Sequence, residues 1–334
     1  MEGLRWDGTG GIPTFPTFAS TEQVERCAFD AAVGQHQHYA EYSYLNMRAW
    51  DTKYRGVAVL NGNLVLRFFD ADEGTTYLSF LGTRAVPETA AELLAAAAAL
   101  GAAPRLRVVP GVVVEGNGRM QRQFRVAEDR DTDYVLSLLA WRTLDGPIFA
   151  DIRYLVGRCL RLHNLDFRMI DPDDRAHRQE MVRLMELRAS QKGVAGDPAI
   201  DEEADALGRL LAVATKARLV TSALFDGRCL VAFSIDEVLG NGYGLGHFWK
   251  ADTSYDGVYQ YMQYRLSEVL LGRGCTFHNI GQDLGIPALA AAKRALRPCA
   301  MLKKYTISPG PGTDHLVGAW HPTVPDPSML VSVA

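Results

Sequence analysis

The segment from Asn279 to Asp283 combines the residue types that acyl transfer requires. Residues 276–280 predict a strand and Pro287 predicts the first turn of a helix, so Gln282 and Asp283 fall at a strand-to-helix turn. Such turns at sheet ends are where α/β folds place ligands. A carboxylate there could accept the proton that an amine or hydroxyl loses as it attacks an activated ester. Asp283 is therefore a candidate general base, with capping of the following helix as the alternative role.

His247 and Lys250 complete the predicted catalytic set, because residues 244–249 predict a strand that faces this turn. A cation at Lys250 could stabilise the oxyanion of a tetrahedral intermediate or bind the terminal ribose and phosphate of a donor. For His247 two alternatives stay open, a direct catalytic role and a hydrogen-bonded place in the core.

Four residues around the same turn are candidate substrate contacts. We expect Asn279 and Gln282 to orient the acyl group, and Lys293 to bind a phosphate or to lie on the solvated surface. Tyr255 is the fourth candidate, although its spacing from Tyr259 is also typical of helix packing.

A basic stretch in the middle of the chain could contact RNA. Arg153, Arg158 and Arg161 are expected to lie on one helix that continues toward Arg168, and the spacing of Arg158 and Arg161 lets them share a face. Phosphates are the main source of affinity for nucleic acids, so this stripe suits the acceptor stem of a tRNA. Lys303 and Lys304 could add further phosphate contacts. Acidic residues are interspersed among these cations, so a solvated surface is the alternative interpretation.

The sequence contains no recognisable binding motif for a metal ion or a nucleotide cofactor. The five cysteines include no CxxC pair, and His36 and His38 lack a third ligand at zinc spacing. The glycine-rich residues 240–246 join two predicted strands, so they do not form a dinucleotide fingerprint. An Arg/Gln-x-x-Gly-x-Gly/Ala run, which cradles the pyrophosphate of acyl-CoA, is also missing. We therefore expect no metal and no cofactor.

Composition indicates a folded chain of ordinary globular type. Its 334 residues suggest two domains, with 48% hydrophobic and 22% charged residues and a formal net charge of -4. The mean hydropathy is -0.06 and the pI is near 6.1, so any contact with a polyanion must be a local patch. Neither a secretory signal nor an apolar run long enough to span a bilayer is visible, so we expect a cytoplasmic protein without a membrane span and without a DNA partner.

The first half predicts a mixed α/β module. Residues 56–60, 63–69 and 76–80 predict strands, and Asn61-Gly62 predicts a hairpin turn between the first two. Helices are expected at 21–34, in the Ala-rich residues 90–103 and near 132–139, with a further strand at 106–109.

The second half repeats this order of elements. Helices are expected at 175–191, 202–216 and 258–272, and strands at 219–225, 229–238, 244–249 and 276–280. Asp226-Gly227 predicts the turn between the first two of these strands. The expected organisation is an N-terminal module at 1–150, a catalytic module at 151–310 and an extended tail at 311–334.

Three blocks of the sequence are similar to the family that includes the C-terminal, cytoplasmic domain of bacterial phosphatidylglycerol lysyltransferases. The first block runs from Glu41 to Trp50, and the second contains Asp133-Tyr134-Val135 with Leu144-Asp145-Gly146. The third joins His247-Phe248-Trp249-Lys250-Ala251 to the stretch from Gln282 through Lys304-Tyr305. Together the blocks follow the family's order from Glu41 to Tyr305.

The resemblance implies two tandem modules of the GNAT acyltransferase type, each a central mixed sheet flanked by helices. It also implies an aminoacyl-tRNA-dependent transferase that needs no cofactor beyond its charged tRNA. The membrane-embedded half of the lysyltransferases is missing here, so a small-molecule acceptor in a natural-product pathway is expected, joined through an amide or an ester. An acyl-CoA-dependent N-acyltransferase and a non-catalytic module that binds RNA or a small molecule are the alternatives.

Overall fold

The computed structural model describes residues 11–50, 55–70, 73–194, 198–213 and 219–310. They fall into two compact units that are discontinuous in sequence. Unit 1 lies within Met1–Ala32, Thr52–Glu128 and Lys304–Ala334, and unit 2 comprises Val33–Asp51 and Asp129–Lys303. The predicted tail at 311–334 lies outside the described residues.

Unit 1 is built on five strands in the order β1-β2-β3-β4-β11. Their bounds are β1 Gly56–Leu60, β2 Asn63–Asp70, β3 Thr75–Leu81, β4 Ala102–Pro110 and β11 Ala300–Pro309. The predicted Asn61-Gly62 turn is confirmed, since both residues have positive φ and the antiparallel register closes at Leu60 opposite Asn63. Strands β3 and β4 are parallel, joined by the helix α3, Val86–Ala96.

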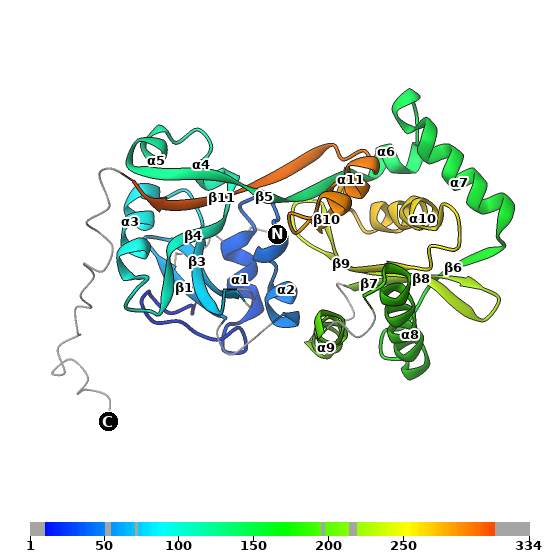
Figure 1. The fold of residues 1–334 in the computed structure, drawn as a ribbon, viewed down its shortest axis with the longest axis horizontal. Coiled ribbons are helices and arrows are strands. Elements are labelled where there is room, and N and C mark those ends of the chain that lie inside the picture. Colours follow the sequence, from blue (N-terminus) through cyan, green and yellow to red (C-terminus); the bar gives the residue numbers. More distant parts are fainter. Residues whose placement is uncertain (1–10, 51–54, 71–72, 195–197, 214–218, 311–334) are drawn as a thin grey trace. The chain divides into compact units, whose positions relative to one another are not determined.

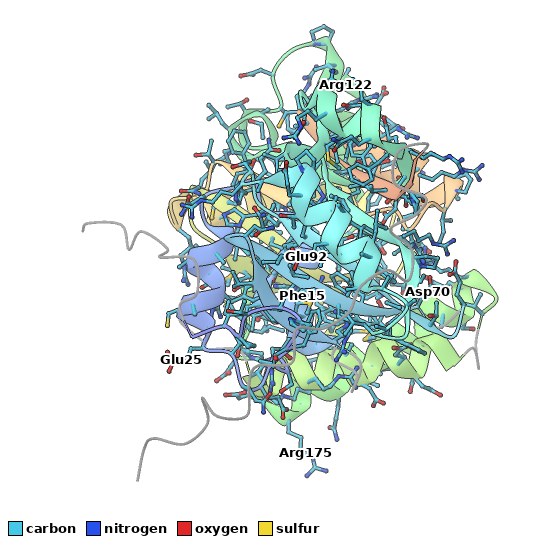
Figure 2. The ribbon with its side chains drawn as sticks, turned by 90° about the vertical axis from the view of Figure 1, so that its left-hand side faces the viewer. Phe15, Glu25, Asp70, Glu92, Arg122 and Arg175 are labelled. Carbon is cyan, nitrogen blue, oxygen red and sulfur yellow. The ribbon has the colours of Figure 1, made fainter. Side chains whose placement is uncertain are left out.

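The core of unit 1 lies between this sheet and α3. Leu93 and Leu94 of the helix pack with Val65, Leu78 and Phe80 of the strands. Phe15 joins the same core from the N-terminal segment (Figure 2). The remaining helices assigned here are α1 Arg26–Val33, α4 Gly111–Val114 and α5 Gly118–Gln123.

Unit 2 has six strands in the order β5-β10-β9-β8-β7-β6. Their bounds are β5 Phe124–Ser137, β6 Leu165–Met169, β7 Leu219–Asp226, β8 Cys229–Val238, β9 Tyr243–Ala251 and β10 Phe277–Gln282. The predicted turn at Asp226-Gly227 is confirmed by the antiparallel pairing of Asp226 with Cys229. Strands β9 and β10 are parallel and are joined by α10, Val258–Gly272.

Helices cover both faces of the unit 2 sheet (Figure 1). Neighbouring residues of β7 point to opposite faces, so Phe225 packs in the core of α8 and α9 and Leu224 in that of α7 and α10. The helical segments are η1 Ala40–Tyr42, α2 Tyr44–Ala49, α6 Leu138–Thr143, η2 Pro147–Phe149, α7 Ala150–Leu162, α8 Arg175–Lys192, α9 Pro198–Val213, α10 and α11 Pro287–Ala295.

Two local predictions are wrong. The helix expected near 132–139 is strand β5 as far as Ser137, because residues 133–136 are fully buried in the middle of the sheet. Arg168 lies on the edge strand β6 and not on the helix of the other arginines, because α7 ends at Leu162. The mixed α/β class of the fold is confirmed.

Candidate active site

The parallel strands β9 and β10 separate part of the way along their length. They pair only from Tyr243 opposite Phe277 to Leu245 opposite Asn279. Beyond this point β9 continues beside β8, whereas β10 bulges between Asn279 and Gln282 and pairs with Asp133 of β5. Parting strands of an α/β sheet form a crevice in which ligands bind.

His247 lies at this parting point as the extra residue of a β-bulge. The register of β8 with β9 passes from Asp236 opposite Gly246 directly to Ile235 opposite Phe248. A bulge redirects the side chain of its extra residue, and bulges are frequent beside active sites. The sequence placed His247 on this strand, and the structure supplies the bulge that orients it.

A buried carboxylate holds His247. Its Nε2 lies 3.1 Å from Oε2 of Glu237, and the two side chains are 3% and 0% exposed. The same Oε2 accepts a hydrogen bond from the hydroxyl of Ser43, at 3.2 Å, and Ser43 in turn caps α2. Because Nε2–H donates to Glu237, the tautomer of a neutral His247 carries its lone pair on Nδ1. A carboxylate that fixes the tautomer in this way is the usual support of a histidine base.

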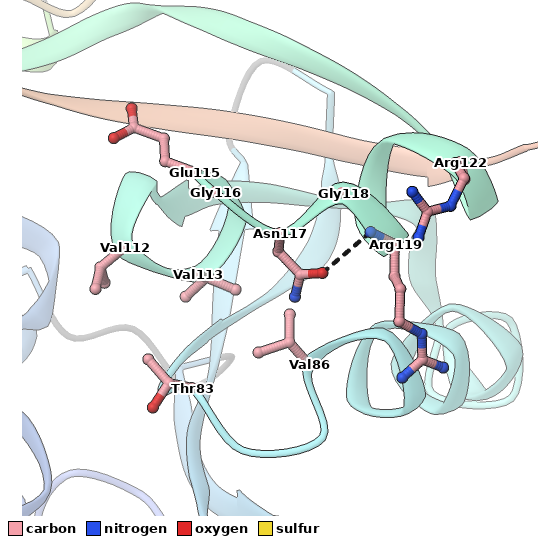
Figure 3. Close-up of a pocket in the computed structure, with 10 residues that line it drawn as sticks. All are labelled: Thr83, Val86, Val112, Val113, Glu115, Gly116, Asn117, Gly118, Arg119 and Arg122. Carbon is pink, nitrogen blue, oxygen red and sulfur yellow. Dashed lines mark hydrogen bonds between the residues drawn. The ribbon is translucent and has the colours of Figure 1, made fainter.

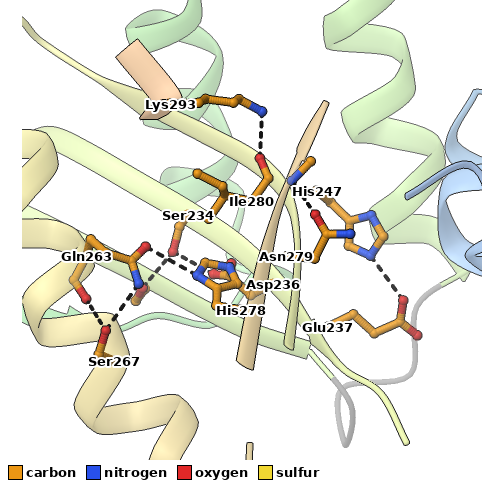
Figure 4. A network of polar contacts seen from close by, with 12 residues as sticks. Ser234, Asp236, Glu237, His247, Gln263, Ser267, His278, Asn279, Ile280 and Lys293 are labelled. Atoms are coloured by element: carbon orange, nitrogen blue, oxygen red, sulfur yellow. Dashed lines mark hydrogen bonds and ion pairs between the residues drawn. The ribbon is translucent and has the colours of Figure 1, made fainter. Parts of the chain in front are cut away.

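A second buried network supports the strands around this pair. Nε2 of His278 lies 2.9 Å from Oδ1 of Asp236, and its Nδ1 lies 3.2 Å from Oε1 of Gln263. Ser234 lies on the same strand as Asp236, and its hydroxyl donates to Oδ2 of Asp236 at 2.7 Å (Figure 4). A satisfied buried network of this kind fixes the positions of its members.

Asn279 binds the protein backbone at this site. Its amide nitrogen donates to the carbonyl of His38 at 2.7 Å and to Oδ2 of Asp133 at 2.9 Å, while its Oδ1 accepts the amide of Gly281 at 2.8 Å. The side chain is fully buried. These contacts make Asn279 a residue that shapes the β10 bulge, in place of the acyl-orienting role that the sequence suggested.

The general-base role suggested for Asp283 is not supported, because the side chain is buried and both of its carboxylate oxygens already accept hydrogen bonds. The residue is 1% exposed, its Oδ2 accepts the hydroxyl of Tyr134 at 2.6 Å and its Oδ1 accepts the amide of Gly285 at 2.9 Å. Burial, and then the bond to Asp283, raise the pKa of Tyr134 to about 12. Nor is Asp283 the cap of α11, since the residue before Pro287 is Ile286. Asp283 stabilises the turn that follows β10.

Lys293 contacts the same turn from α11. Its Nζ donates to the carbonyl oxygens of Ile280 and Gln282, at 2.7 and 2.6 Å. A Cβ added to Gly281 would lie 3.7 Å from this Nζ and 3.9 Å from the carbonyl oxygen of Gly246. The structure thus brings Gln282 and Lys293 to the parting point of the strands.

Lys250 and Tyr255 bind carboxylates away from the parting point. Nζ of Lys250 lies 2.6 Å from Oε1 of Glu203 on α9, in a partly buried ion pair. Tyr255 donates to Oδ2 of Asp226 at 3.0 Å, and burial followed by this bond raises its pKa to about 12. Neither contact joins the residue to His247.

The six cations expected to bind tRNA do not form one surface. Arg153, Arg158 and Arg161 lie on α7, where Arg158 is paired with Asp256 at 2.6 Å. Arg168 is paired with Asp166, and Lys303 is on β11. The prediction for Lys304 is wrong, because its side chain is fully buried in unit 1 and cannot meet a phosphate.

Glu237, Asp236, His278 and Ser43 were missed by the sequence interpretation. A signal was present, since Asp236-Glu237 interrupts the apolar strand 229–238, and adjacent carboxylates in a buried strand need partners.

A cavity of about 410 Å³ lies elsewhere, in unit 1 (Figure 3). None of the predicted site residues lines it; the lining residues are Thr83, Val86, Val112, Val113, 115–119 and Arg122. The part of the chain that the structure describes contains no group of His, Cys, Asp and Glu side chains that could hold a metal ion. In that same part, every helix is too short or too polar to cross a membrane.

A family profile described as "Phosphatidylglycerol lysyltransferase, C-terminal" matches residues 34–308. This range includes both diverging strands and the Glu237–His247 pair. The match confirms the resemblance that the three sequence blocks indicated, and with it the prediction of an acyl- or aminoacyl-transferring enzyme. The comparison with curated proteins gives no match.

Solved structures with the same fold include a conserved protein of unknown function from Bacteroides thetaiotaomicron VPI-5482, with 21% identity, a TM-score of 0.72 and coverage of 88% of this chain and 99% of that one. The C-terminal domain (DUF2156) of a putative lysylphosphatidylglycerol synthetase from Agrobacterium fabrum has 13% identity, a TM-score of 0.56 and coverage of 84% and 90%. L-PGS from Bacillus licheniformis has 15% identity, a TM-score of 0.56 and coverage of 87% and 96%. At these identities the likeness establishes a GNAT-like fold.

Proposed function

Because this chain belongs to the family of phosphatidylglycerol lysyltransferase C-terminal domains, we propose that it transfers an aminoacyl group from tRNA to a hydroxyl of a phospholipid headgroup. The observation that carries the proposal is the family match over the strands that hold His247 at their parting point. A lipid acceptor replaces the small natural-product acceptor expected from the sequence, because the family is described by a phospholipid-modifying activity. Because charged tRNA is the proposed donor, the proposed reaction takes place in the cytoplasm.

The reaction is a transesterification that needs no oxidant, reductant or further energy source. The acceptor oxygen attacks the carbonyl carbon of the aminoacyl ester, a new carbon–oxygen bond forms, and the bond to the 3′-terminal ribose of the tRNA breaks. The proton lost by the acceptor hydroxyl is finally taken up by the ribose oxygen that leaves. Since the ester is already activated, catalysis consists mainly of positioning and of moving this proton.

His247 is the group that we assign to the proton transfer. Its Nε2 bond to Glu237 leaves Nδ1 to accept the proton of the acceptor hydroxyl and to return it to the leaving ribose oxygen. The carboxylate of Glu237 stabilises the imidazolium that forms in between. Burial of this carboxylate in unit 2 strengthens that interaction, because the local dielectric constant is low.

Lys293 and Gln282 support the position of the acyl group in this proposal. Lys293 fixes the carbonyl groups of the β10 turn, and its cationic Nζ lies beside Gly281. A cation at this place favours the developing negative charge of the tetrahedral intermediate. Asp283 contributes by keeping the turn folded.

The test is a transfer assay with purified chain, a mixture of radiolabelled aminoacyl-tRNAs and vesicles that contain phosphatidylglycerol. We expect label in the lipid extract, and we expect complete digestion of the tRNA by ribonuclease before mixing to abolish it. Parallel reactions offer a soluble amine mixture and acyl-CoA. Transfer that survives tRNA digestion, or transfer from acyl-CoA alone, would overturn the proposal.

A further inference from the structure

Exposed apolar side chains are concentrated on one part of unit 2. The described residues include ten large apolar side chains that are exposed, and six of them lie between Leu139 and Met169, a stretch of about a tenth of the chain. The six are Leu139, Ile148, Tyr154, Leu160, Leu162 and Met169. Exposed apolar groups that gather in this way mark an interaction surface.

Helix α7 presents the centre of this surface. Its buried side, formed by Ile152, Val156 and Cys159, belongs to the core that α7 shares with α10 (Figure 1). On the remaining sides Tyr154, Leu160 and Leu162 are 57%, 54% and 58% exposed. The helix is thus anchored on one side and presents large apolar groups to the solvent.

Positive charge accompanies these apolar groups. Arg153 and Arg161 are exposed on α7, and within the described ranges neither forms an ion pair with a carboxylate. Arg153 donates instead to the carbonyl oxygens of Leu144 and Gly146, which do not neutralise it. Asp151, the acidic residue of this helix, is paired with Arg297 at 3.2 Å.

We propose that this surface docks on an anionic lipid bilayer. It is defined by Ile148, Tyr154, Leu160 and Leu162 together with Arg153 and Arg161, and it is called the α7 surface below. A helix with aliphatic and aromatic groups between arginines lies in the bilayer interface, where the apolar groups enter the acyl boundary and the cations meet the headgroup phosphates.

The apolar groups favour lipid over RNA as the occupant. Phosphates of an acceptor stem would satisfy the arginines, but they would leave Leu160 and Leu162 in contact with a charged backbone. A bilayer satisfies both kinds of side chain at once. The purpose of this docking rests on the proposed function, because a lipid acceptor must be reached in its membrane. The docking itself depends only on the α7 surface.

The experiment is co-sedimentation of the full chain with sucrose-loaded vesicles of phosphatidylcholine, with or without about one third phosphatidylglycerol. We expect binding to the anionic vesicles, weakened by added salt. The double variant Leu160→Asn, Leu162→Asn should lower the partition coefficient tenfold or more, because two buried leucines are lost from the interface. Val194→Asn, an exposed apolar residue outside the α7 surface, is the matched control and should bind as the parent does.

Folding is checked by circular dichroism and by the thermal midpoint, which substitutions at exposed leucines should leave within a few degrees. No binding of the parent chain to anionic vesicles would overturn the inference, as would equal binding by the double variant. A dimer in light scattering that the double variant dissociates would assign the surface to a second copy instead. Loss of charged-tRNA binding in Arg153→Gln, Arg161→Gln with vesicle binding unchanged would assign it to RNA.

A soluble acceptor separates this inference from the proposed function. Glycerophosphoglycerol, the headgroup without its acyl chains, should be aminoacylated equally by the parent and by the leucine variant, whereas transfer to vesicles should fall with the partition coefficient. Binding to vesicles without transfer to either acceptor would contradict the proposed function and leave the docking surface supported.

Discussion

Each of the two units contains a pair of parallel strands joined by a helix, but the surroundings of this motif differ between them. In unit 1 the parallel strands β3 and β4 are joined by α3, and in unit 2 β9 and β10 are joined by α10. The junction of β3 with α3 is filled by Asn63, which exchanges hydrogen bonds with the backbone of Arg84 and donates to Thr89. A Cβ on Gly82 would lie 2.1 Å from Oδ1 of Asn63, so Asn63 fills the space beside Gly82, while the cavity of unit 1 lies next to Thr83 and Val86. In unit 2 the pairing of β9 with β10 ends at Leu245 opposite Asn279, beside the bulge at His247.

Buried charge shows the same difference. Among the described residues of unit 2, six acidic or histidine side chains are buried: His38, Asp133, Asp236, Glu237, His278 and Asp283. Unit 1 buries Lys304. Burying an ionisable group is costly unless it is paired, so a concentration of such groups marks the unit in which chemistry takes place. One fold thus serves as scaffold in unit 1 and as candidate active site in unit 2.

The substitution Glu237→Gln should cause the largest loss of kcat among the variants that test this comparison. The amide retains the shape of the side chain but cannot stabilise an imidazolium at His247, so kcat should fall about a hundredfold while KM changes little. Steady-state transfer kinetics measure both constants. Glu268→Gln, on the exposed side of α10, is the matched control and should be nearly unchanged. A rise in KM with kcat retained would instead give Glu237 a role in binding.

Asp283→Asn should affect stability and not catalysis. The amide replaces a carboxylate that accepts from Tyr134 and Gly285, so the free energy of unfolding should fall by about 1–2 kcal/mol. Urea unfolding measures this change, and the kcat of the folded fraction should stay within threefold of the parent value. A hundredfold loss of kcat at unchanged stability would restore Asp283 as the catalytic base.

Asn63→Ala tests the scaffold role of unit 1. It removes the bonds to Arg84 and Thr89 and should lower the free energy of unfolding by about 1–2 kcal/mol. Transfer by the folded protein should stay at the parent level, as judged by active-site-normalised rates below the thermal midpoint. A loss of transfer as large as that of Glu237→Gln would show that both units take part in the chemistry.

The smallest effect concerns the titration of Tyr134. Its pKa is about 12 in the folded state and about 10 in an unfolded chain, so the folded state binds this proton more tightly. The resulting stability is present below pH 10 and is lost as the pH rises through 12. Phenolate absorbance of the parent minus that of Tyr134→Phe should rise with a midpoint near 12. A midpoint near 10 would contradict the buried bond to Asp283.

Local signals explain what the sequence could predict. The turns at Asn61-Gly62 and Asp226-Gly227 follow from backbone preferences of two residues, and both were predicted correctly. Strand β5 was mistaken for a helix, because its conformation is imposed by pairing with β10 and not by its own residues. Asp283 was placed correctly at the turn after β10, but its burial depends on Tyr134, far away in sequence. Glu237 and His247 meet only once the bulge has formed.

The central claim is that His247, oriented by Glu237, moves the proton in unit 2. Single-turnover transfer from aminoacyl-tRNA with enzyme in excess measures this step without product release. His247→Ala should slow it by about 10²- to 10⁴-fold in the folded fraction, at a lower thermal midpoint because Glu237 loses its buried partner, whereas His177→Asn, in the first turn of α8, should match the parent in rate. A rate for His247→Ala within threefold of the parent would contradict the account.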